Sequence, residues 1–300
     1  MPPSFQQLFK FTVGEKTDGS PTEFNVHEEA FAALSEPLSK LMKGGMAESQ
    51  AAKTKWNDVN KETFEMFAQF AYTGDYSIPK TKMRAAKEKI TNDAPVDTFS
   101  GEVNGPVTPS PLPPSSPSDF WFPVEPRSAF EEKWGSSRKH KSKKTMSLKS
   151  TISDFQSLSF PLSTSRDSYL KSYEPSKEFN QNQDYSNVFL GHASLYVLGD
   201  LWLVDSLKSL VLYKLHKTLC AFQINNESVD DILALTRYAY SEEVEGADHD
   251  EGIGGLRSLV CQFLKLNAAT LSLDDGFMKL LWEGGPVATD MFKAVAQMSL

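Results

Sequence analysis

The chain has 300 residues, a net charge of −8 and a hydrophobic fraction of 40%. Its isoelectric point near 5.3 argues against a nucleic-acid platform, because phosphate binding needs a basic face. The richest apolar segment, residues 195–215, carries too many charges for a membrane span. We therefore expect a cytoplasmic or nuclear protein, or one found in both places, that binds other proteins and neither membrane nor nucleic acid. The charges in that segment are Asp200, Asp205, Lys208 and Lys214.

The two cysteines, Cys220 and Cys261, are too few for a disulfide framework and lack C-x-x-C spacing. Because free cysteine is usually buried, we expect two reduced, buried thiols. The sequence has no phosphate-binding loop, no Gly-x-Ser-x-Gly elbow and no His-Glu-x-x-His pair. His27 and His192 each lie beside an apolar face, with no second metal ligand at a suitable spacing. We expect no catalytic residue, no metal and no cofactor, and a protein that is not an enzyme.

The first elements form a small sheet with short helices. Apolar residues alternate in 8–13 and in 23–27 around a turn-forming stretch, which predicts an antiparallel hairpin. After residue 28 the apolar residues recur at a helical spacing, which predicts a first short helix. Ser35 then offers an N-cap hydroxyl for a second short helix, with Pro37 in its first turn. Gly44-Gly45 ends that helix.

A third strand is predicted at residues 53–59, around Trp56. Asn60 then caps a longer helix that stops at Thr73-Gly74-Asp75. Apolar residues recur in this helix at the spacing of one buried face: Phe64, Phe67, Ala68 and Ala71.

Residues 81–184 are predicted to be a disordered insert, because a stretch this rich in proline, serine and lysine cannot bury a core. Residues 120–122, Phe-Trp-Phe, are apolar for such a region and are either a docking motif or a segment that folds back onto the domain. The insert offers proline-directed phosphorylation sites at Thr108, Ser110 and Ser116. It also carries a basic run that is either a nuclear import signal, a weak nucleic-acid patch or a solvated charge run: Arg138, Lys139, Lys141, Lys143 and Lys144.

Order is predicted to return near Tyr185, with a pair of apolar helices at 188–199 and 207–219. Further helical patterns follow to the end of the printed sequence. They cover 229–240, 256–266, 276–282 and 287–298.

Several separated motifs together resemble the BTB/POZ family, in the fungal stand-alone form. They are Phe24-x-Val26-His27, Ser35-x-Pro37-Leu38, Gly44-Gly45-Met46-x-Glu48-Ser49, Phe64-x-x-Phe67-x-x-Phe70-x-Tyr72-Thr73-Gly74-Asp75-Tyr76 and His192-Ala193-x-Leu195-Tyr196-Val197-Leu198-Gly199-Asp200.

The resemblance implies an α+β fold, in which a small sheet is flanked by helices and split by the insert. The first part of the BTB/POZ domain would cover 1–80, the insert 81–184 and the helical completion of the domain 185–222. Residues 223–300 are similar to the all-α BACK extension that often follows such domains.

The implied function is protein–protein interaction, as a non-catalytic adaptor or scaffold. Met46 and Glu48 are similar to the hydrophobic-x-Glu motif by which some BTB adaptors bind a cullin, and Tyr72 matches a family position near that surface. A substrate adaptor of a cullin-RING ubiquitin ligase is therefore one alternative, and a nuclear, transcription-linked factor that uses the basic run is a second. Because only residues 1–7 precede the first strand, we do not expect the helix and strand that longer family members swap in a homodimer, although a smaller dimer interface stays open.

Overall fold

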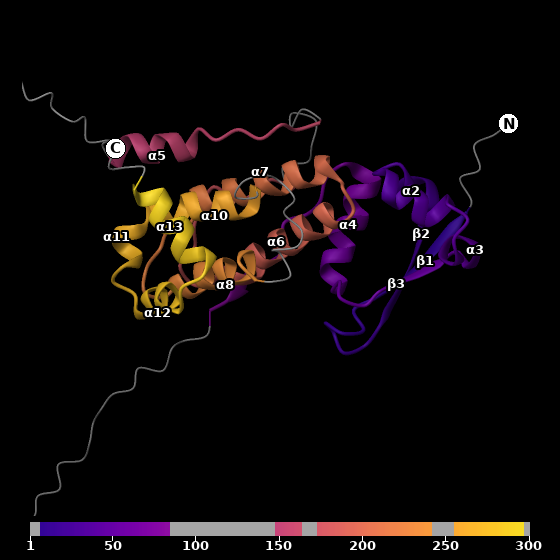
Figure 1. Cartoon of the computed structure of the whole chain (residues 1–300), viewed down its shortest axis with the longest axis horizontal. Coiled ribbons are helices and arrows are strands. Elements are labelled where there is room, and N and C mark those ends of the chain that lie inside the picture. The colour runs from indigo at the N-terminus through magenta and orange to yellow at the C-terminus, as the bar shows by residue number, and fades with distance from the viewer. Residues whose placement is uncertain (1–6, 85–147, 164–172, 242–254, 297–300) are drawn as a thin grey trace, which may run out of the picture. The chain divides into compact units, whose positions relative to one another are not determined.

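The structure is a computed structural model that describes residues 7–84, 148–163, 173–241 and 255–296 (Figure 1). All of these residues belong to one unit, to which the segments before and after the 85–147 gap both contribute. The fold is α+β, with a small sheet and a larger helical part, as predicted from the sequence.

The sheet has three strands in the order β2-β1-β3. Strand β1 (Leu8–Val13) pairs antiparallel with β2 (Thr22–His27), which confirms the predicted hairpin. Strand β3 (Lys53–Trp56) adds to the other edge of β1 in parallel, with Val13 opposite Trp56. The third strand is therefore confirmed, although it ends at Trp56 instead of at Val59.

Three short helices connect β2 to β3: α1 (Glu28–Ala32), α2 (Glu36–Lys43) and α3 (Ala47–Ala51). The predicted cap of α2 is confirmed, since the Ser35 Oγ accepts a hydrogen bond from the Leu38 amide at 3.4 Å. Gly45 follows α2 with a φ of +76°, a conformation that glycine adopts without steric cost. Helix α3, which was not among the elements predicted from the sequence, forms between Gly45 and β3.

Helix α4 (Lys61–Thr73) packs its apolar face against the sheet. The predicted N-cap is confirmed, because the Asn60 Oδ1 accepts a hydrogen bond from the Thr63 amide at 2.7 Å. Phe64 and Phe67 are fully buried, and the Phe64 ring lies 5.1 Å from that of Phe11 on β1. This aromatic cluster fixes the sheet to α4.

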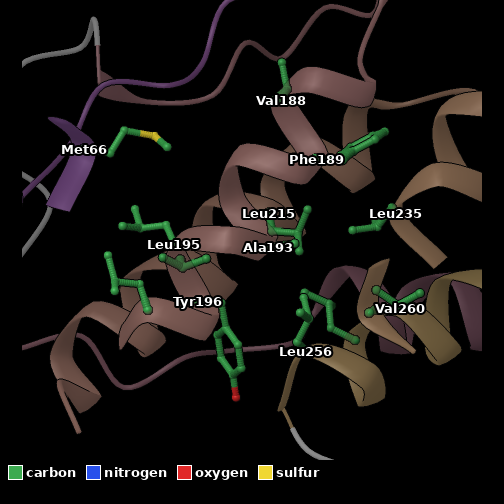
Figure 2. Close-up of a cluster of buried hydrophobic side chains, with 14 of the residues drawn as sticks. Met66, Val188, Phe189, Ala193, Leu195, Tyr196, Leu215, Leu235, Leu256 and Val260 are labelled. Carbon is green, nitrogen blue, oxygen red and sulfur yellow. The ribbon is translucent and has the colours of Figure 1, made fainter. Parts of the chain in front are cut away.

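Beyond the gap, α6 (Ser186–Leu201) packs against α4, α7 (Asp205–Ala221) and α8 (Val229–Ala239). Figure 2 shows how Met66 of α4 lies near Leu195 of α6, while Leu235 and Val260 approach α6 from the C-terminal helices. At the turn between α6 and α7, the Trp202 indole stacks on that of Trp56, with ring centroids 4.9 Å apart and planes 20° apart. The segments before and after the gap therefore share one hydrophobic core.

The remaining helices are α10 (Gly255–Leu266), α11 (Ala268–Leu271), α12 (Asp275–Glu283) and α13 (Pro286–Ala296). Helical segments occur where the sequence pattern predicted them, with α11 in addition. Helix α10 contacts α7, α8 and α13, so the C-terminal helices pack on the same body as α6 and α7.

The bounds predicted for the disordered insert, 81–184, were too wide, because helices and strands of the structure lie near both ends of this range. Strands β4 (Lys82–Met83) and β5 (Gln183–Asp184) pair antiparallel and bring the ends together. Helix α5 (Leu148–Gln156) contacts α10 and buries Phe155 to 4% exposure. Its composition suggested disorder, but one phenylalanine enters the core beside His216 and Phe263. Residues 85–147 and 164–172 lie outside the described residues.

Candidate interaction site

Met46 and Glu48 lie on the short helix α3, next to the sheet. Met46 is the N-cap residue of α3, and its side chain is 54% exposed. Its carbonyl accepts a hydrogen bond from the Ser49 Oγ at 2.8 Å, which fixes the first turn. Glu48 is exposed one residue into the helix. An apolar side chain and a carboxylate are thus presented together by an ordered backbone, available to a partner.

Tyr72 lies at the C-terminal end of α4 and is half exposed. Its hydroxyl accepts a hydrogen bond from the His27 amide at 2.8 Å and lies 3.0 Å from the His27 Nδ1. Tyr72 therefore joins α4 to the end of β2. Within the described residues, no hydrogen bond or ring contact connects it with Met46 or Glu48.

A buried set of polar side chains, here called the polar junction, consists of Asp75, Tyr76, His192 and Lys214. The Lys214 Nζ lies 2.5 Å from the Asp75 Oδ1, and both side chains have no solvent exposure. The same Nζ donates to the Tyr76 carbonyl at 2.5 Å and sits 4.2 Å from the centre of the Tyr76 ring. Two residues from before the gap thus bind two from after it.

His192 completes the polar junction. Its Nδ1 lies 2.9 Å from the Tyr76 hydroxyl, and its Nε2 has no hydrogen-bond partner among the described residues. Burial lowers the pKa of His192 to about 3, and the positive charge of Lys214 adds to the effect. His192 is therefore neutral at physiological pH and acts as a packed core residue.

A second buried cluster surrounds the Asp231 carboxylate of α8, which is 1% exposed. The Arg84 Nη2 donates to the Asp231 Oδ2 at 2.7 Å and to the Gln183 carbonyl at 2.9 Å. From the other side, the Tyr185 amide donates to the Asp231 Oδ2 at 3.0 Å and the Ser186 Oγ donates to the Oδ1 at 3.1 Å. Asp231 therefore connects α8 with residues on both sides of the 85–147 gap.

Neither buried cluster was predicted from the sequence. The signal for Lys214 was its position within the apolar stripe of its helix, beside Val211 and Leu215, where a charge must find a partner. No comparable local pattern distinguishes Asp231 from Asp230, its exposed neighbour.

The two thiols differ in their surroundings. Cys261 on α10 is buried as expected, and burial raises its pKa. The expectation for Cys220 was wrong, because this residue is exposed. It comes after the buried residues Thr218 and Leu219, at a position where α7 faces outward. Its Sγ lies 3.3 Å from the His216 Nε2.

A cavity of about 450 Å³ lies beside the β4–β5 pair. The rings of Phe179, Tyr185 and Phe222 form one wall and contact each other at centroid distances of 5.1 to 5.5 Å. Lys80 and Glu174 also line it, and the Glu174 carboxylate accepts a hydrogen bond from the Tyr213 hydroxyl at 3.2 Å. The cavity presents aromatic surface with charges at its edge.

Several predicted features fall outside the described residues, among them the Phe-Trp-Phe stretch at 120–122. Across 7–84, 148–163, 173–241 and 255–296, no group of three or more His, Cys, Asp or Glu side chains is arranged to hold a metal ion. Within the same ranges, no helix combines the length and the hydrophobicity that crossing a bilayer requires. The site residues outside the described part are Thr108, Ser110, Ser116, Arg138, Lys139, Lys141, Lys143 and Lys144.

No protein-family model matches the chain, and no significant similarity was found to a curated protein or to a solved structure. A proposal for its function therefore depends on the residues of the chain and on their geometry.

Proposed function

We propose that the chain is a protein-interaction module of the BTB/POZ kind that acts as a non-catalytic adaptor or scaffold. The observation that carries the proposal is the topology of the first segment: a β1–β2 hairpin, three short helices, a strand β3 parallel to β1, and then α4. Apart from the additional helix α3, this is the element order that the sequence motifs implied for the family. The helix pair α6–α7, which packs on α4 from beyond the gap, supplies the part that completes such a domain.

The polar junction supports the idea of one split domain. Burying an ion pair costs several kcal/mol of desolvation per ion unless both partners are held in place. Asp75 and Lys214 lie on opposite sides of the gap and are buried only when the two segments are together. Their burial is expected of a single domain and not of two that merely touch.

A cullin-binding adaptor is the more specific form of this proposal. Its support is the exposure of Met46 and of Glu48 on α3. An exposed methionine can fill an apolar pocket of a partner, while the nearby carboxylate accepts hydrogen bonds at the rim. Tyr72 fits this role less well, because its hydroxyl is already bonded to His27.

The alternative of a nuclear, transcription-linked factor depends on the basic run at 138–144 and stays a prediction. Replacing its five arginine and lysine residues with alanine would shift a fluorescently tagged chain from the nucleus to the cytoplasm if the run is an import signal. An unchanged distribution would contradict that role.

Affinity purification of the tagged full chain, followed by mass spectrometry, tests the proposed function. We expect specific protein partners, with a cullin among them if the adaptor form is correct. A Met46→Ala, Glu48→Ala double variant should lose the cullin and keep partners that bind elsewhere. Recovery of no specific protein, together with turnover of a small molecule, would contradict the proposal.

A further inference from the structure

Helix α12 exposes an apolar stripe that the fold does not use. Phe277 and Leu280 face the core and are almost fully buried. On the opposite side, Trp282 is 90% exposed and Met278 is 46% exposed. Leaving these apolar surfaces in water forgoes the stabilisation that their burial would give.

The exposed side of α12 has a regular pattern, here called the α12 stripe: Asp275, Met278, Lys279, Trp282 and Glu283. These residues follow the i, i+3, i+4, i+7, i+8 spacing of a helix face that packs against another helix. Together they line one open depression on the surface. The helix is well defined, since the Asp274 Oδ1 caps its start at 2.8 Å from the Phe277 amide and Gly284 ends it with a φ of +79°.

The charges of the α12 stripe indicate what covers it. Asp275, Lys279 and Glu283 follow each other at intervals of four residues, with alternating sign. Within the described part of the chain, neither Lys279 nor Glu283 forms an ion pair. A partner with one dominant charge would meet both like and unlike charges here, whereas an antiparallel copy whose two-fold axis passes near residue 281 sets Lys279 opposite Glu283 twice. An axis at residue 279 would instead oppose Lys279 to Lys279, so the charges select the offset register.

We infer that the α12 stripe is a homodimer interface, in which the α12 helices of two copies pack antiparallel about a two-fold axis. Trp282 of one copy packs near Met278 of the other, and Lys279 pairs with Glu283 across the axis, twice. An interface around a two-fold axis uses the same patch on both subunits, which this self-complementary pattern satisfies. A parallel arrangement would instead oppose Lys279 to Lys279.

The size of the patch sets the expected affinity. A stable interface buries about 800 Å² on each partner, and a nine-residue helix supplies only part of that. Helix α13, which packs against α12, exposes Phe292 and Val295 and can add further area. We therefore expect a dissociation constant on the order of 10 μM. This dimer does not depend on the proposed BTB/POZ function.

Sedimentation velocity of the full chain, from low to high micromolar concentration, tests the inference. The wild-type chain should change from monomer to dimer across this range. Trp282→Ala should weaken dimerisation at least about thirtyfold, as expected for a central aromatic anchor. Leu201→Ala is the matched control, because Leu201 is 64% exposed but lies on α6, and it should change nothing. Since all of these side chains are exposed, circular dichroism should report unchanged folding.

Charge reversal tests the antiparallel geometry. Lys279→Glu and Glu283→Lys should each weaken the dimer, because each creates two like-charged pairs. The double variant exchanges the two charges and should restore the wild-type affinity. A chain that is monomeric at every concentration would overturn the inference, as would a dimer that survives Trp282→Ala. A double variant no better than the single ones would overturn the antiparallel pairing.

Discussion

The Lys214 Nζ and the Asp75 carboxylate form an ion pair of 2.5 Å in which neither side chain reaches solvent. The two residues come from α7 and from the segment just after α4, on opposite sides of the 85–147 gap. Removing one partner of a buried ion pair leaves an uncompensated charge, which is far more costly than losing the pair as a whole.

Asp75→Asn and Lys214→Met should therefore each lower the free energy of unfolding by about 3–5 kcal/mol. Asparagine keeps an oxygen for the Tyr76 amide, so the effect reports the charge and not the loss of that hydrogen bond. The double variant should cost clearly less than the sum of the two single ones. Urea unfolding measures all three, and additive costs would argue against direct coupling.

An exposed ion pair provides the control for that cycle. Lys40 and Glu36 are 2.7 Å apart on α2, but their side chains are 67% and 77% exposed. Lys40→Met should leave the free energy of unfolding almost unchanged, because water and salt screen exposed pairs.

The depressed pKa of His192 predicts a stability loss in mild acid. The folded chain keeps His192 neutral down to a pKa of about 3, whereas the unfolded chain binds a proton near pH 6.5. Stability from this residue is complete above about pH 6.5 and declines as the pH falls toward 3. Between pH 7 and pH 5 the loss should be about 2 kcal/mol. Urea unfolding at both pH values measures it, and His192→Gln should show a correspondingly smaller loss, while an identical pH dependence would contradict the assignment.

Phe155 should control the docking of α5. Its ring lies 5.0 Å from that of His216, whose Nε2 lies 2.8 Å from the Phe155 carbonyl. Phe155→Ala removes the buried anchor and should lower the local opening free energy of residues 148–163 by about 2–3 kcal/mol. Hydrogen exchange read by mass spectrometry should show the change there and not in α6. Ile152→Ala, on an exposed side of the same helix, should have little effect.

Met46 and Glu48 allow a test that separates binding from folding. Because both are exposed, the Met46→Ala, Glu48→Ala variant should change the free energy of unfolding by about 0.5 kcal/mol or less. If a cullin binds there, its affinity should fall at least about thirtyfold. Isothermal titration with a purified cullin measures this, and Leu8→Ala, 51% exposed on β1, is the control. Unchanged cullin binding would remove these residues from the interface.

Two fragments should reconstitute the fold when they are expressed together. Residues 1–90 carry the sheet and α4, and residues 145–300 carry the helices that cover them, including α5. Each alone exposes part of the common core, so neither should be soluble by itself, while together they should co-purify. Two fragments that each fold and do not associate would contradict a single split domain.

Local signals in the sequence predicted most of the fold. Ser35 and Asn60 cap helices through hydrogen bonds that span three residues, so their roles could be read from neighbouring positions. The hairpin and the long apolar helices depend on periodicity, which is also local. Strand β3 was also predicted from its own residues around Trp56, although its end at Trp56 was not.

Features that depend on distant partners were not predicted. Helix α5 has little apolar character of its own, and its order depends on His216 and Phe263. The partners of Asp231 are Arg84, Tyr185 and Ser186, which no spacing rule connects with it. For the candidate site, the sequence pointed to Met46 and Glu48, which are both exposed, but the helix that presents them was not predicted.

The Trp56–Trp202 stack gives the molecule a built-in optical signal. Two indoles 4.9 Å apart are close enough for their ultraviolet transitions to couple, so their contribution to the circular dichroism spectrum differs from that of two separated indoles. One indole belongs to β3 and the other to the turn between α6 and α7, so this contribution changes when the two segments separate. Joining and separation of the two segments can therefore be followed in real time without attaching a dye.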